Sequence, residues 1–253
     1  MNRVAIALRT ESFIKNVSML LGKLIISEKL KIKIKNEDYE IIIVEMPYST
    51  DTKTIERSRK IFEKYCEKKG LHMIDGESTS CDEKNKIYAI KVLSSLEALK
   101  DTKGLEIRNK KFGVTCRKLN PILIEALSYD SLSIVIFDRE FNLSKKEKLY
   151  KKIIVDKGLS IAYTKDRDPL MKNSDIIIGD NFADKSIILD KISIIEDWEE
   201  VILLPKGLCL ENDGFSKNNF NHQIIKVFLY FNRDMEVRDI ASSFTVSNLG
   251  NLP

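Results

Sequence analysis

The second half of the chain carries a series of short apolar runs, most of them rich in β-branched residues and each about as long as a buried strand. Stretches with helical spacing lie between them, such as one that begins at Pro121 and one that Ser144 caps and Gly158 ends. Parallel strands need crossover connections, so this alternation predicts a parallel sheet with helices on both faces. The predicted strands are residues 111–116, 133–137, 159–163, 175–179, 186–189 and 201–204.

The first half predicts a separate arrangement of strands and helices. Residues 4–8 form an apolar run of strand length, and residues 29–35 alternate strictly between lysine and apolar side chains. Residues 39–45 follow after a polar turn, so residues 29–45 predict a hairpin whose lysine face protects a sheet edge. The other expected elements are helices at 13–24, 51–70 and 87–104, a strand at 71–74 and a polar loop at 75–85.

Three segments of the second half resemble the nucleotide-binding domain of Rossmann-type dehydrogenases. They are residues 112–116 (FGVTC), 134–138 (IVIFD) and 173–179 (NSDIIIG). The last is similar to a strand common in dehydrogenases related to shikimate dehydrogenase and glutamyl-tRNA reductase. The resemblance covers about residues 110–205 and implies a Rossmann-like, mostly parallel sheet with helices on both faces.

We therefore expect an α/β protein with two α/β lobes. A soft boundary falls at residues 104–110, where glycine and several basic residues separate the two patterns. The expected domains are an N-terminal α/β domain at residues 1–107 and a Rossmann-like domain with a C-terminal extension at residues 108–253.

The loop after the first strand of this domain departs from a dinucleotide site. Such a site uses glycines to bring the backbone close to the pyrophosphate and a helix N-terminus to bind it. Only Gly113 is present, because Thr115 and Lys118 stand where the second and third glycines would fall. Arg117 and Lys118 could supply charge in place of glycine amides. Three interpretations stay open: NAD(P) in its usual pose, a scaffold with this loop closed, and another anionic ligand.

Further candidate cofactor-binding residues lie at the ends of the later strands. Asp138 ends the second strand, where an acid binds the ribose hydroxyls of NAD, although such acids also cap turns. Arg139 could instead accept a 2′-phosphate, so both NAD and NADP are possible cofactors. Cys116 lies near the expected start of a helix, which lowers a thiol pKa, but packing is the alternative role. The candidate cofactor-binding residues are Gly113, Cys116, Arg117, Lys118, Asn120, Asp138, Gly179 and Asp180.

Composition excludes several classes of protein. The four cysteines form no CxxC pair, and with only two histidines no metal site is predicted, so we expect reduced thiols and a cytoplasmic location. A net charge of +4, from 42 basic and 38 acidic residues, is too small and dispersed for a nucleic-acid binder. No apolar run approaches the roughly 18–20 residues of a membrane span, which argues against a membrane partner.

These patterns favour a small-molecule-binding or accessory protein that holds a small anionic or nucleotide-like ligand without turnover. One alternative is an active NAD(P)-dependent oxidoreductase with an unknown small substrate. No catalytic residue is assigned, since no nucleophile elbow or acid–base pair is recognisable. Another alternative is a structural or interaction protein in which the apolar residues 223–231 form a homodimer face. The same stretch also fits a core helix, which we favour.

Overall fold

The computed structural model describes residues 2–10, 25–34, 37–47, 51–76, 80–104, 106–115, 120–137, 151, 153–179, 194–195, 201–206 and 221–247. The chain divides into two compact units. The first unit is Met1–Lys84 with Leu204–Met235, and the second is Asn85–Leu203 with Glu236–Pro253. This division differs from the expected boundary at 107/108, because most of the long helix before that boundary lies in the second unit.

The first unit contains a four-stranded sheet with the order β2-β3-β1-β4. Strand β1 (Asn2–Thr10) pairs in parallel with β3 (Glu37–Pro47) and β4 (His72–Asp75), while β2 (Ile25–Ile34) pairs antiparallel with β3. The predicted hairpin is therefore confirmed. Strand β2 lies at the sheet edge, with Lys29 and Lys31 exposed to solvent, as the alternating lysines indicate.

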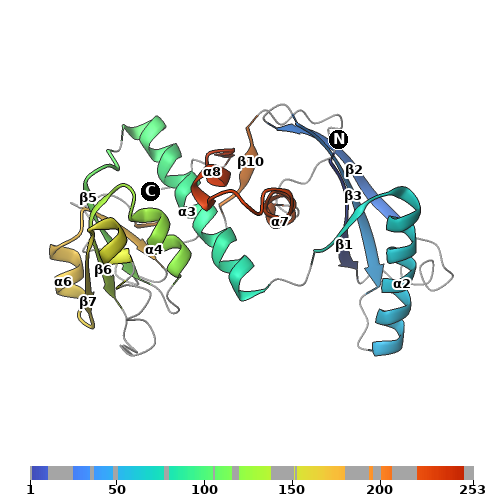
Figure 1. Ribbon diagram of the computed structural model, residues 1–253, viewed down its shortest axis with the longest axis horizontal. Helices are drawn as coiled ribbons and strands as arrows, with labels where there is room; N and C mark the ends of the chain where they lie inside the picture. The colour runs from blue at the N-terminus through green and yellow to red at the C-terminus, as the bar shows by residue number, and fades with distance from the viewer. Residues whose placement is uncertain are drawn as a thin grey trace. The chain divides into compact units, whose positions relative to one another are not determined.

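Two helices cover opposite faces of this sheet (Figure 1). Helix α2 (Thr52–Lys69) begins at Asp51, whose carboxylate accepts from the backbone N–H of Lys53 and Thr54, and ends at Gly70 with φ 61°. Its inner face packs on alternate residues of β1 and β3. That cluster contains Ala5, Ala7, Ile42, Val44, Phe62, Cys66 and Leu71.

Helix α7 (Asn221–Phe231) covers the other face, which presents the intervening residues of the same strands. Phe228 of α7 stacks on Tyr39 of β3 with ring centroids 5.8 Å apart. Ile224, Ile225, Val227 and Phe228 are all buried. The core interpretation of residues 223–231 is therefore confirmed for these four side chains.

The second unit is built on a five-stranded sheet with all neighbouring strands parallel. Its order is β7-β6-β5-β8-β9. In chain order this is 3-2-1-4-5, the arrangement of a dinucleotide-binding sheet. The second unit is Rossmann-like. The strands are β5 (Lys110–Thr115), β6 (Ser131–Phe137), β7 (Ser160–Thr164), β8 (Ile176–Gly179) and β9 (Ile194–Ile195).

Two of the strands expected in this unit are not found where they were predicted. The expected strand at 186–189 lies outside the described residues. The helix expected at 13–24 in the first unit also lies outside them. The expected strand at 201–204 is shifted to β10 (Leu203–Pro205) and does not join the parallel sheet. It pairs instead with β11 (Phe244–Val246), a partner about 40 residues later that no local pattern indicates.

Among the described residues, the helices of the second unit include α3 (Cys81–Lys103), α4 (Pro121–Leu127), α6 (Arg167–Lys172) and α8 (Val237–Ala241), and residues 153–157 are also helical, where a helix ending at Gly158 was expected. Helices α4 and α6 flank the sheet on opposite sides (Figure 1). The expected polar loop at 75–85 is wrong for residues 81–85, which form the first turns of α3. Ser80 caps this helix, because its hydroxyl accepts from the backbone N–H of Glu83.

The two cysteines whose placement is described differ in exposure. Cys66 is buried, and burial together with Glu63 and Glu67 raises the pKa of its thiol to about 11, whereas Cys81 is exposed. We expect iodoacetamide at pH 8 to modify Cys81 and to spare Cys66, because the thiolate is the reactive form. Peptide mapping by mass spectrometry measures each site, with guanidinium-unfolded protein as the control. Equal labelling of both thiols in the folded protein contradicts this expectation.

Candidate functional site

The carboxyl edge of the parallel sheet is the first candidate site. In an open α/β sheet, ligands bind beyond the carboxyl ends of the strands where the strand order reverses. Here the chain passes from β5 to β6 and β7 on one side and then crosses to β8 on the other. The reversal therefore lies between β5 and β8, whose last residues, Thr115 and Gly179, are paired.

Thr115 places a polar side chain at this point. The residue is only 4% exposed, and its Oγ1 has no hydrogen-bond partner within the described part of the chain. A buried hydroxyl without a partner costs about 1–3 kcal/mol, so such groups are rare in folded proteins. Within the residues that the structure describes, the reversal point therefore holds a hydroxyl whose donor and acceptor are both unused.

Gly113 lies inside strand β5 rather than in the loop after it. It pairs with Val135 of β6 and Ile177 of β8, and Leu170 of α6 packs against both of these side chains. A Cβ atom on Gly113 would stand 2.5 Å from the Ser174 Oγ and 2.9 Å from the Leu170 Cδ1. The absence of a side chain therefore lets α6 and the turn after it approach the sheet.

Asn120 is also used by the fold. It precedes α4 and caps that helix, since its side-chain carbonyl accepts from the backbone N–H of Leu123 at 3.1 Å. Its side-chain amide donates to the backbone carbonyl of Asn85 at 2.8 Å, which ties the end of the loop to helix α3. Both halves of this buried amide have partners.

The structure brings only part of the predicted cofactor set together. Gly113, Gly179 and Asn120 are described, the two glycines on the neighbouring strands β5 and β8. Their proposed role in cofactor binding stays a prediction. Cys116, Arg117, Lys118, Asp138 and Asp180 lie outside the described residues.

A cavity of about 930 Å³ lies within the second unit, at the opposite edge of the sheet. It is next to the amino-terminal ends of β5 and β6, where Arg108 and Asp130 precede the two strands, and it is lined by α3, α4 and the segment around α8. Helix α8 lies against α3, and the Ser94 hydroxyl donates to the carbonyl of Ala241. The apolar part of the lining consists of Leu93, Leu96, Ile107, Phe112, Ala126, Leu127 and Ala241.

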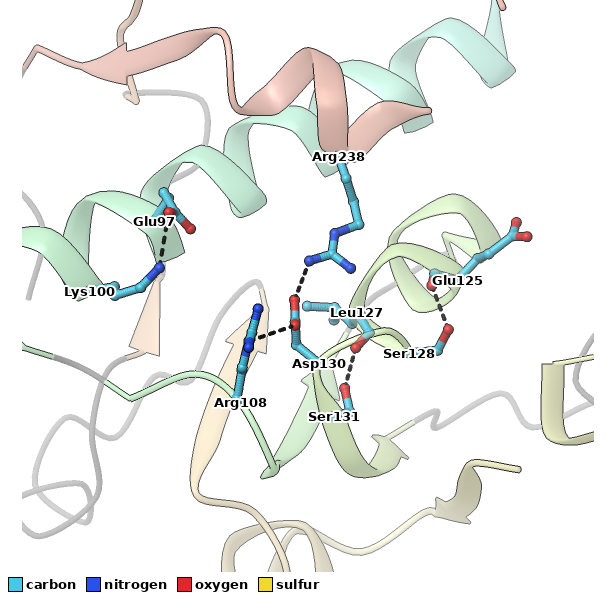
Figure 2. A network of polar contacts seen from close by, with 9 residues as sticks. All are labelled: Glu97, Lys100, Arg108, Glu125, Leu127, Ser128, Asp130, Ser131 and Arg238. Carbon is cyan, nitrogen blue, oxygen red and sulfur yellow. Dashed lines mark hydrogen bonds and ion pairs between the residues drawn. The ribbon is translucent and has the colours of Figure 1, made fainter. Parts of the chain in front are cut away.

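Asp130 organises the charged side of this cavity (Figure 2). Its Oδ2 lies 2.5 Å from Nη2 of Arg238, and its Oδ1 lies 3.8 Å from Nε of Arg108. Glu97 and Lys100 of α3 form a second pair at 3.2 Å. Two guanidinium groups thus converge on one carboxylate beside an apolar floor, an arrangement suited to binding a polar ligand. Sequence reasoning missed this cavity.

A buried lysine is the main polar feature of the first unit. Lys226 of α7 is 2% exposed, and its Nζ donates to the carbonyls of Gly76 at 3.0 Å and Asp75 at 3.3 Å. These contacts join α7 to the carboxyl end of β4. Sequence reasoning missed Lys226, which stands in an otherwise apolar stretch. Within the described ranges, no group of three or more histidine, cysteine or acidic residues is placed to hold a metal ion.

Comparisons with known proteins add little beyond the fold. No family model matches the chain, and no curated protein sequence matches it. One similar solved structure is shikimate 5-dehydrogenase from Listeria monocytogenes in complex with shikimate and NAD. It has 13% identity and a TM-score of 0.36, and the match covers 71% of this chain and 68% of that one.

Two further structures are comparably distant. Ornithine carbamoyltransferase from Pyrococcus furiosus has 14% identity and a TM-score of 0.35, over 75% of this chain and 62% of that one. Dipicolinate synthase, A chain, from Bacillus subtilis has 11% identity and a TM-score of 0.31, over 55% of this chain and 42% of that one. The chain thus spans less than two thirds of both these proteins. The Rossmann-like assignment rests on the strand order described above.

Among the described residues, no helix is both long enough and apolar enough to cross a membrane.

Proposed function

We propose that this chain is a small-molecule-binding or accessory protein, which holds a small anionic or nucleotide-like ligand at the carboxyl edge of β5 and β8 without turnover. The observation that carries the proposal is the buried hydroxyl of Thr115, which has no partner within the described part of the chain and lies where the strand order reverses. A ligand oxygen at this point would satisfy the hydroxyl.

The sequence next to Thr115 supports an anionic ligand. Arg117 and Lys118 stand between the end of β5 and the cap of α4, so two positive charges accompany this edge in the chain. The loop lacks the second and third glycines with which dehydrogenases approach the pyrophosphate. This departure favours a binding protein over a conventional dehydrogenase.

The second candidate function is an NAD(P)-dependent oxidoreductase. It is favoured by the position of Asp138, which directly follows Phe137, the last residue of the second strand of the Rossmann-like sheet. An acid at that place is typical of ribose recognition in NAD-dependent enzymes.

The substitution Thr115→Val tests the proposed site, because valine keeps the shape of threonine without its hydroxyl. We expect the variant to unfold at the same or a higher temperature than the parent protein, since an unpaired buried hydroxyl is lost. We also expect it to bind NADH, NADPH or AMP about tenfold more weakly in calorimetric titrations, as the loss of one ligand hydrogen bond predicts.

Thr164→Val is the matched control. Thr164 ends strand β7 of the same sheet, but its hydroxyl already donates to the carbonyl of Asp166 and accepts from the N–H of the same residue. This control is expected to lose stability and to keep its ligand affinity. If the parent protein binds none of the three nucleotides at millimolar concentration, the proposal of a nucleotide-like ligand at this edge is wrong. If the Thr115 variant binds as tightly as the parent, the hydroxyl has no role in the site.

A further inference from the structure

The cavity at the amino-terminal edge of the sheet is separate from the site proposed above. Arg108 and Asp130 precede strands β5 and β6, whereas Thr115 lies at the carboxyl end of β5. Its volume of about 930 Å³ is within the range of about 300–1,000 Å³ that is common for small-molecule sites. Any ligand of this cavity is therefore a second one.

The cavity presents donors that the fold leaves largely unused. The Arg108 side chain is highly exposed, and among the described residues its guanidinium contacts only Asp130, at 3.8 Å, which is beyond hydrogen-bond distance. Arg238 uses one N–H on Asp130 and stacks over the Tyr129 ring at 5.0 Å. A guanidinium has five N–H donors in a fork that matches a carboxylate. The two arginines thus offer a carboxylate-binding pair (Figure 2).

The same cavity carries an excess of acidic groups. Of the described residues, five acidic and three basic ones line it, so a ligand with several negative charges would be repelled. Two of the acids have other partners near the rim: Glu106 pairs with Lys110 at 3.5 Å, and Glu236 accepts from the Tyr129 hydroxyl at 3.4 Å. The carboxylate of Asp239 has no partner within the described ranges and lies next to Arg238 in α8.

The floor between these groups is apolar. Leu93 of α3 and Ile107 line it with partly exposed side chains, while Leu96, Phe112 and Leu127 of the lining are buried. An apolar ligand group on this surface would gain about 25 cal/mol for each Å² removed from water. The cavity therefore combines two arginine side chains, the carboxylate of Asp239, which has no partner among the described residues, and an apolar surface.

We propose that this cavity binds a free apolar α-amino acid as its zwitterion. The carboxylate of the ligand pairs with Arg108 and Arg238, its ammonium group pairs with Asp239, and its side chain lies on the partly exposed side chains of Leu93 and Ile107. A zwitterion fits the balance of charges, because each end meets the opposite sign and the ligand adds no net charge to a lining that is already acidic.

Calorimetric titration of the full-length protein with four compounds tests the ligand class. L-phenylalanine and L-leucine carry both charged groups, 3-phenylpropanoate lacks the ammonium group, and 2-phenylethylamine lacks the carboxylate. We expect the two amino acids to bind and each truncated compound to bind at least about tenfold more weakly, since a partner in the cavity is then left unpaired. Failure of both amino acids to bind at millimolar concentration overturns the proposal, as does tighter binding of either truncated compound.

Two substitutions at exposed positions test which side chains contact the ligand, and neither is expected to destabilise the fold. Arg108→Gln is expected to weaken L-phenylalanine and 3-phenylpropanoate alike, by about tenfold. Asp239→Asn is expected to weaken L-phenylalanine and to leave 3-phenylpropanoate unchanged. Arg57→Gln, an exposed arginine of α2 in the first unit, is the control and keeps the parent affinity. Parent affinity in both cavity variants overturns the assignment. We expect the same variants to bind nucleotides with the parent affinity. A negative result for amino acid binding in the cavity would therefore not count against the proposed function at the carboxyl edge, and the reverse also holds.

Discussion

The substitution Phe228→Asp is expected to prevent the first unit from folding. Phe228 is 4% exposed and lies between α7 and the sheet, with its ring stacked on Tyr39. Truncating a buried phenylalanine costs about 3–5 kcal/mol, and a carboxylate placed there without a partner adds a further desolvation cost. The sum is comparable with the whole stability of a small domain, about 5–15 kcal/mol.

Circular dichroism and size-exclusion chromatography measure this outcome together. We expect loss of the cooperative thermal transition of the first unit and an expanded or aggregated species. His222→Asp is the matched control, because it introduces the same charge at an exposed position of the same helix and is expected to leave the transition in place. A folded Phe228→Asp protein with half the parent mass would instead support residues 223–231 as a dimer face.

Most strands of the two sheets around β1 and β5 could be predicted because their residue patterns have a simple period. The lysine and apolar residues of 29–35 alternate, and such a pattern predicts a strand with one face in water and the other in the core. The runs at 134–137 and 176–178 are continuously apolar because central parallel strands are buried on both faces. Such patterns are local, so one sequence suffices to see them.

The first turns of α3 could not be predicted from a periodic pattern of apolar residues. Cys81, Asp82 and Lys84 are exposed, so the first turns of the helix carry no apolar period. Their only local signals are the cap at Ser80 and the acids of the first turn, which also fit a polar loop. Secondary structure at such a helix end depends on one hydrogen bond rather than on packing.

Contacts between distant segments could not be predicted from the pattern. Residues 204–235 belong to the first unit although the Rossmann-like sheet separates them from it in the chain. The cavity is likewise built from segments that lie far apart in the chain. Its charged groups come from α3, from the residues that precede β5 and β6, and from α8. No spacing rule joins Glu97, Asp130 and Arg238. Only the packing of these elements places them around one volume.

Gly113 shows how one residue fits two hypotheses. In the sequence it occupies the first glycine position of a dinucleotide loop, and in the structure it lies within β5 beneath Leu170 and Ser174. We expect Gly113→Ala to lower the free energy of unfolding by about 1–3 kcal/mol, the usual cost of overpacking. The added Cβ would stand 3.0 Å from the Ser174 Cβ, which cannot move away by simple rotation of a side chain.

Chemical denaturation of four variants isolates this effect: Gly113→Ala, Ser174→Gly, the double variant and the control Lys111→Ala. Lys111→Ala changes an exposed residue of the same strand and is expected to leave the stability nearly unchanged. Adding Ser174→Gly to Gly113→Ala removes the Oγ and Cβ of Ser174, two of the three nearest atoms that the new Cβ meets. The double variant should therefore lose less stability than the two single substitutions together, because residues in contact are not additive. A Gly113→Ala protein with parent stability and weakened nucleotide binding would assign the glycine to the ligand, because only a backbone approached by a phosphate would be sensitive to the methyl group.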